Sequence, residues 1–162
     1  MKNVFIRDFE QSVRKWFGEV AAKRGLSVDK VNDGVLQIRA PKFRLRISGS
    51  RNHGTDLIDV GITLFADESE RGIGLANIME FRGDRFVSPE LRARSADVDA
   101  EVRHLSDLTE EYCGSFLAGQ RDQWNEIVQF VEDKVTREGI HKSKFGLPRF
   151  VRQEWEVETD DD

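Results

Sequence analysis

The residues that could do acid–base or metal chemistry are scattered along the chain. The three histidines, His53, His104 and His141, lie in three different segments and show no ligand spacing such as His-x-x-x-His. His53 falls among polar residues in a predicted loop over 49–56, and loops often carry sites. Because a lone loop histidine is usually solvated, we expect no role for His53, with catalysis or ligand binding as the alternative.

Two further features resemble parts of functional sites but lack the residues that would complete them. Cys113, the only cysteine, lies beside Tyr112 on an apolar helical stripe and has no basic neighbour to activate its thiol. The stretch Gly72 to Asn77 begins like a dinucleotide-binding loop, but it lacks the third glycine and a βαβ context. We therefore expect a buried, inert thiol and no nucleotide site.

The carboxylate pairs do not predict a catalytic site either. Glu68 and Glu70 fall in an acidic loop, and Glu110 and Glu111 fall on a helix surface, where solvated charge is the common case. No serine sits in a nucleophile elbow. These residues predict a protein that is not an enzyme and that holds no cofactor and no metal, with an enzyme whose site is assembled only in three dimensions as the alternative.

The composition indicates a globular chain with well-mixed charges. The 162 residues suffice for one domain, and eleven Phe with three Trp argue against wholesale disorder. A net charge of -5 gives no global attraction to nucleic acids or to membrane surfaces. No apolar run approaches the roughly 20 residues of a membrane span, and none near the start is typical of a signal peptide. We expect a soluble cytoplasmic protein.

The N-terminal segment predicts an amphipathic helix. Asp8 is placed to cap its exposed amides, with Gln11 three residues on as in a capping box. Gly25 is the expected end, since glycine tolerates the left-handed conformation there. The apolar residues that recur at helical spacing are Ile6, Phe9, Val13, Trp16, Phe17 and Val20.

Four strands are expected to follow as an antiparallel meander. The first, over 28–31, runs into Asp33-Gly34, the signal of a type I′ turn that needs positive φ at both residues. The return strand is Val35 to Arg39. A third strand over 42–48 and a fourth over 57–65 alternate between apolar and other residues, as strands with one buried face do.

The third of these strands carries its basic residues on one face. Lys42, Arg44 and Arg46 alternate with the apolar residues Phe43, Leu45 and Ile47. If the fourth strand lies alongside, Asp59 is expected to pair across with Arg44 or Arg46. We favour a solvated, partly neutralised outer face, with a basic stripe that binds a ligand as the alternative.

Between the sheet and the terminal helices the pattern is weaker. Residues 67–74 read as a loop, and 75–79 predict a short helix ended by Gly83, with a hairpin over 81–87 as the alternative. Residues 88–91 predict a further helical turn that has proline near its start.

The longest helical pattern runs from Val98 to Val135 and organises the fold. Its apolar residues recur every three or four positions, with a break at Gly119 that predicts two segments. The elements together predict an α+β fold: an N-terminal amphipathic helix, a four-stranded antiparallel meander, and a long C-terminal helical pair packed on the sheet. The predicted boundaries are a single α+β domain over 1–140 and a charged C-terminal extension over 141–162.

The C-terminal extension is the predicted partner-binding segment. A basic block is followed by an acidic block, and blocks of one sign often act as interaction tails. The alternative is a solvated tail pinned by its aromatic residues. The candidate partner-binding residues are Glu154, Glu156, Glu158, Asp160, Asp161 and Asp162.

The run from Leu105 to Gly119 resembles a Leu-x-x-Leu…Tyr…Phe-Leu-x-Gly helix of small bacterial proteins, found among polymorphic-toxin immunity proteins. The resemblance implies an α+β fold and a partner-binding role, and it carries no catalytic residues. We therefore hypothesise a noncatalytic cytoplasmic protein that binds another protein, as an immunity protein neutralising a cognate bacterial toxin. The alternative is a type III-like secretion chaperone or effector adaptor. The oligomeric state is left open, a dimer included.

Overall fold

The computed structural model describes residues 4–51, 57–67, 69–85, 91–92 and 95–144. The chain divides into two compact units, residues 1–122 and residues 123–162, and each unit is described by itself. In the described ranges, the first unit contains the sheet and three helices, and the second contains one helix. The predicted boundary between a domain over 1–140 and an extension over 141–162 stays a prediction.

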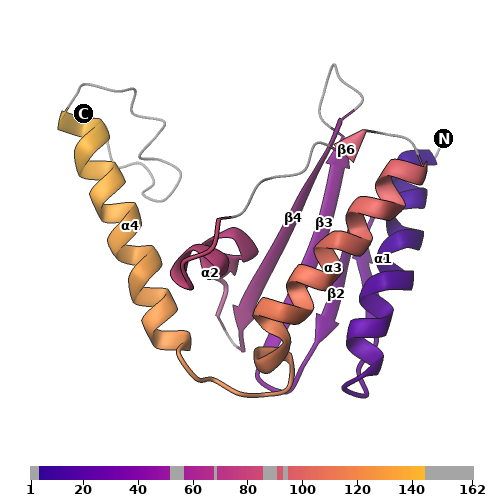
Figure 1. The fold of residues 1–162 in the computed structure, drawn as a ribbon, viewed down its shortest axis with the longest axis horizontal. Coiled ribbons are helices and arrows are strands. Elements are labelled where there is room, and N and C mark those ends of the chain that lie inside the picture. Colours follow the sequence, from indigo (N-terminus) through magenta and orange to yellow (C-terminus); the bar gives the residue numbers. More distant parts are fainter. Residues whose placement is uncertain (1–3, 52–56, 68, 86–90, 93–94, 145–162) are drawn as a thin grey trace. The chain divides into compact units, whose positions relative to one another are not determined.

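The first unit is an α+β fold built on an antiparallel sheet (Figure 1). Its first half follows the predicted order, with a helix and then four consecutive strands: α1 (Val4–Ala22), β1 (Val28–Asn32), β2 (Val35–Arg39), β3 (Phe43–Arg51) and β4 (Leu57–Ala66). Each of these strands pairs with the next one, so the predicted meander is confirmed.

The sheet has two short strands beyond the four that were predicted. They come before and after the helix α2 (Leu75–Phe81) and are β5 (Gly72–Gly74) and β6 (Leu91–Arg92). Both pair with β4, β5 at residues 63–65 and β6 at residues 57–58. The loop predicted over 67–74 is therefore wrong at its end, and the helical turn predicted over 88–91 is wrong at Leu91. Residues 86–90 lie outside the described part of the chain.

One face of the sheet is covered by α1 and by the helix α3 (Ser95–Leu117), which lie side by side in front of the strands in Figure 1. Their apolar residues pack with the inward-facing residues of the strands, and burial removes this surface from water. The largest fully buried side chains of this unit are Phe9, Phe17, Phe43, Phe116, Leu36, Ile38, Leu45, Ile47, Leu64, Ile78 and Leu117.

The start and end of α1 differ in how well the sequence predicted them. The helix begins at Val4, so Asp8 lies inside it and the predicted capping box is wrong. The half-buried Ile6 continues the apolar stripe toward the N-terminus, which explains the earlier start. The end is confirmed: Gly25 has φ of 70°, and the amides of Gly25 and Leu26 donate back to the carbonyls of Ala22 and Ala21. This is a Schellman end, which needs a left-handed residue.

The hairpin between β1 and β2 is confirmed, but its turn type is not the predicted one. Gly34 has φ of 77°, whereas Asp33 is not among the described residues with positive φ. The pairing register shifts between Lys30 and Asn32. A bulge beside a glycine of positive φ replaces the type I′ turn.

The predicted division of residues 98–135 at Gly119 is confirmed. Gly119 has φ of 92°, and the amides of Gly119 and Gln120 close α3 by donating to the carbonyls of Phe116 and Ser115. The second unit then begins, and its helix is α4 (Trp124–Lys144). Thus α3 packs on the sheet as expected, while α4 belongs to a unit described on its own. No helix in the described ranges is both long and apolar enough to cross a membrane.

Candidate functional site

The predicted candidates for acid–base or metal chemistry are not brought together by the described residues. His104 lies exposed on α3, His141 belongs to α4, and His53 lies outside the described ranges. Among the side chains that the structure describes, no group of three or more His, Cys, Asp or Glu residues could hold a metal ion.

Cys113 is buried in α3, as predicted. Burial disfavours the charged thiolate and raises the pKa of Cys113 to about 12. A thiol in that state is protonated at neutral pH and is a poor nucleophile. The residue therefore belongs to the core.

Glu110 is not the solvated surface charge that its position in the sequence suggests. Its carboxylate accepts hydrogen bonds from both terminal nitrogens of Arg24, and the Nζ of Lys23 lies 3.7 Å away. The bond from Arg24 holds the pKa of Glu110 below its ordinary value of 4.5. This pair joins the end of α1 to α3, and it is a structural contact. Glu70 and Glu111 are exposed, and Glu68 lies outside the described ranges.

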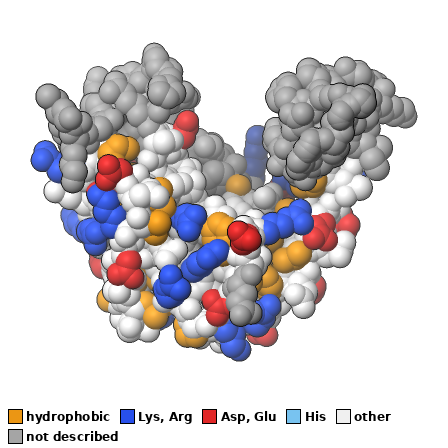
Figure 2. Space-filling model, turned by 180° about the vertical axis from the view of Figure 1, so that it is seen from behind, with side chains coloured by type: hydrophobic (Ala, Val, Ile, Leu, Met, Phe, Trp, Pro, Cys, Tyr) orange, Lys and Arg blue, Asp and Glu red, His pale blue; other side chains and the backbone are white. Residues whose placement is uncertain are grey.

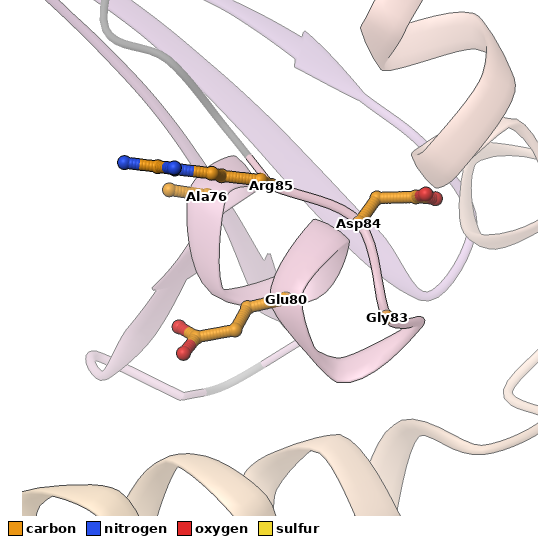
Figure 3. A pocket seen from close by; sticks show the side chains of 5 residues that line it. All are labelled: Ala76, Glu80, Gly83, Asp84 and Arg85. Carbon is orange, nitrogen blue, oxygen red and sulfur yellow. The ribbon is translucent and has the colours of Figure 1, made fainter.

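A pocket of about 500 Å³ lies at α2 and the turn that follows it, lined by Ala76, Glu80, Gly83, Asp84 and Arg85. Figure 3 shows the Glu80 and Arg85 side chains extending to one side and Asp84 to the other. Asp84 accepts a hydrogen bond from the Tyr112 hydroxyl on α3, which raises the pKa of Tyr112 to about 12. Ligand pockets are mostly apolar with a few convergent polar groups. The polar groups of this pocket diverge, so it lacks the convergent groups that are typical of a ligand site.

The face of the sheet opposite to α1 and α3 gathers the basic residues of two strands. Residues directly opposite each other on paired strands share a face. Arg39 pairs with Arg44 and Gln37 with Arg46 between β2 and β3, and Arg44 pairs in turn with Phe65 of β4. We call this surface the outer face and define it by Gln37, Arg39, Arg44, Arg46, Thr63 and Phe65. Figure 2, which views the molecule from behind, shows Lys and Arg side chains beside hydrophobic ones.

The arginines of the outer face are not neutralised by described residues. The predicted pairing of Asp59 with Arg44 or Arg46 is wrong, because Asp59 lies opposite Ser50, well along β4 from both. No described carboxylate forms a salt bridge with Arg39, Arg44 or Arg46. The Nε atoms of Arg44 and Arg46 are buried and have no hydrogen-bond partner among described residues. Part of their hydrogen-bonding capacity is thus unused.

Phe65 holds the two guanidinium groups of β3 in place. The guanidinium of Arg44 lies over the Phe65 ring at 4.6 Å from its centroid, and that of Arg46 lies at 5.4 Å. A terminal nitrogen of Arg44 also donates a 2.9 Å hydrogen bond to the Ser69 carbonyl. These contacts orient the cations without cancelling their charge.

Gly72 lets the Phe65 ring lie close to the sheet. Gly72 pairs with Phe65 between β5 and β4, and a Cβ added at Gly72 would lie only 2.7 Å from the ring atom Cε1. The ring covers a glycine on the edge strand, an arrangement that stabilises such positions. Phe65 and Gly72 are the residues that sequence analysis missed, since β5 was predicted as loop.

The outer face can bind anions by charge and by planar hydrogen bonding. Arginine presents donors in a rigid fork that matches a carboxylate, and a stacked guanidinium keeps that fork oriented. The acidic residues that were predicted to bind a partner lie outside the described ranges; they are Glu154, Glu156, Glu158, Asp160, Asp161 and Asp162. The outer face is therefore the described surface with the strongest case for a partner.

No family model, curated protein or solved structure matches the chain, so the surface chemistry of its own residues carries the functional assignment.

Proposed function

We propose that this chain is a noncatalytic protein-binding protein whose outer face is its binding surface. The observation that carries the proposal is the cluster of Arg39, Arg44 and Arg46, which has no described carboxylate partner. Arg39 and Arg44 lie directly opposite each other, and like charges in that position destabilise a sheet. An acidic partner surface relieves this repulsion.

A protein partner fits the outer face better than a nucleic acid does. Proteins that bind single-stranded nucleic acid stack bases on open aromatic rings. Here the Phe65 ring lies against Gly72 and under two guanidinium groups, so its faces are already used.

The kind of protein we propose is an immunity protein that neutralises a cognate bacterial toxin. Support comes from the resemblance of the run from Leu105 to Gly119 and from the unneutralised arginines of the outer face. Such a protein acts by occupying a surface, which requires a rigid, charged face and no chemistry. The cytoplasm is the compartment we propose for it.

The acidic residues from Glu154 to Asp162 are proposed as a second contact, used if the toxin is a nuclease with a basic cleft. Complementary charges raise association rates more than affinities. Replacing Glu154, Glu156 and Glu158 by Gln should then slow association in low salt. Unchanged association kinetics with the partner would remove this segment from the interface.

The test uses the protein encoded by the neighbouring reading frame. Both proteins are purified and mixed, and light scattering with calorimetry gives stoichiometry and affinity. We expect a stable complex that Arg46→Gln weakens and that Arg7→Gln, an exposed arginine on α1, leaves unchanged. A stable dimer of this chain that holds a disordered effector segment would instead favour the secretion chaperone. An absence of binding to the neighbouring protein counts against the immunity class.

A further inference from the structure

The distance between the Arg44 and Arg46 side chains on the outer face favours some acidic partners over others. Arg44 and Arg46 lie two residues apart on β3 and point to the same face. Strands rise about 3.4 Å per residue, so the two side chains leave the strand about 7 Å apart. An extended peptide repeats its own side chains at this same distance, on every second residue.

The surface beside Arg46 is low. Thr63 of β4 lies directly opposite Arg46, and Gly74 of β5 lies opposite Thr63, whereas Phe65 lies opposite Arg44. A Cβ added at Gly74 would have its nearest contact at 3.9 Å, an ordinary van der Waals distance, so this position is not crowded. Small residues allow a backbone to approach closely. An extended segment fits on this shelf more closely than a helix about 10 Å wide.

The guanidinium groups also favour carboxylates. The Nε atoms of Arg44 and Arg46 are buried, so an approaching acceptor would use the two terminal nitrogens of each guanidinium, which form the outer side of the fork. Carboxylates accept from that fork with two parallel hydrogen bonds. Carboxylates on alternate residues of one strand place one acceptor group over each arginine.

We infer that the outer face binds an extended acidic segment of a partner protein, with Glu or Asp on alternate residues facing Arg44 and Arg46. This inference rests on the proposed protein-binding function and names the chemistry of the partner. Phe65 is a positioning residue in this inference, because its ring lies against the two guanidinium groups.

The probe is a pair of capped peptides with the same composition, acetyl-Glu-Thr-Glu-Thr-Glu-amide and acetyl-Glu-Glu-Thr-Thr-Glu-amide, of which only the first has Glu on alternate residues. Binding to the full chain is measured by calorimetry in low salt and in high salt. We expect the alternating peptide to bind more tightly, and Arg46→Gln to weaken it about tenfold, as the loss of one charge-assisted hydrogen bond does. Equal affinities for the two peptides would overturn the inference.

Two further variants separate the role of charge from that of geometry. Arg46→Lys keeps the charge but loses the fork, and we expect it to weaken the alternating peptide and reduce its advantage over the isomer. Phe65→Leu keeps both arginines, so we expect the same loss of discrimination if the ring orients them. Thermal unfolding of each variant identifies any that fails to fold, and Arg7→Gln is the charge-matched control.

The chain itself contains Glu on alternate residues at Glu154, Glu156 and Glu158, and this segment is a competing occupant. The full chain with Glu154→Gln, Glu156→Gln and Glu158→Gln is therefore tested beside the natural sequence. Peptide binding by both proteins supports a partner segment. Binding that appears only in the neutralised variant assigns the face to the chain's own acidic residues and overturns the inference. A helical peptide with Glu four residues apart that binds more tightly than the alternating one also overturns it.

Two outcomes separate peptide binding at the outer face from the immunity function. If the neighbouring protein binds and Arg46→Gln has no effect, the chain is a binding protein that uses another surface. If the alternating peptide binds and the neighbouring protein does not, the outer face recognises acidic segments but the immunity class is wrong.

Discussion

The indole Nε1 of Trp16 donates a 3.0 Å hydrogen bond to the Asp99 carboxylate, which joins α1 to α3 at their polar edge. The same carboxylate oxygen accepts a 3.0 Å bond from the Ser12 hydroxyl. The guanidinium of Arg103 lies over the Trp16 ring at 4.7 Å and the Nζ of Lys15 at 4.6 Å. These contacts and the pair of Arg24 with Glu110 hold the two helices that cover the sheet.

The first prediction concerns this hydrogen bond. Trp16→Phe keeps an aromatic ring for the cations but removes the N–H donor, so we expect a loss of about 1–2 kcal/mol in the free energy of unfolding. Urea denaturation of Trp16→Phe, Asp99→Ala and the double variant measures the coupling in a double-mutant cycle. A coupling energy near zero would show that the bond contributes nothing to stability.

The second prediction concerns pH and the pair of Arg24 with Glu110. The folded state lowers the pKa of Glu110, so the pair stabilises the protein above the ordinary value of 4.5 and the stabilisation is lost as pH falls through the folded pKa. We expect Glu110→Gln to cost about 1–2 kcal/mol at neutral pH and progressively less in acid. Denaturation across this pH range checks the trend, with the exposed Glu111→Gln as control. A cost that does not change with pH contradicts the prediction.

Helix ends and strand alternation were readable from the sequence because they are local. Gly25 and Gly119 were predicted to end their helices and do so, since a left-handed residue is needed at one position in the chain. The alternation of Arg44 and Arg46 with buried residues likewise placed them on the outward side of β3.

The pairing of residues that are distant in the sequence could not be predicted in the same way. Alternation assigns a residue to a face but not to a register, so Asp59 was given to the correct face and to the wrong partner. β5 and β6 are too short to show a pattern of their own and exist by pairing with β4. The contact of Phe65 with Gly72, and with it the support for the arginines, depends on that pairing.

The third prediction uses Tyr112, the only tyrosine in the chain. The hydrogen bond that its hydroxyl donates to Asp84 raises the pKa of Tyr112 to about 12 from an ordinary value of 10.0. The bond therefore stabilises the fold fully below pH 10.0, and this stabilisation is lost as pH rises through the folded pKa. Ultraviolet titration of the folded protein should show little tyrosinate near pH 10, and Asp84→Asn should bring the titration back toward that value. Normal titration in the natural sequence would contradict the hydrogen bond.

The last prediction compares alanine substitutions at two glycines of the first unit. A Cβ at Gly49 on β3 would lie 2.7 Å from the ring of Phe9, which is fully buried, so Gly49→Ala should displace that ring and destabilise the fold by about 1–3 kcal/mol. A Cβ at Gly18 within α1 would meet nothing within 4 Å, and alanine favours a helix interior over glycine. Gly18→Ala should therefore stabilise by about 0.5–1 kcal/mol. Denaturation of the two variants gives opposite signs if Phe9 packs directly over Gly49, whereas a neutral Gly49→Ala would show that α1 sits farther from the sheet.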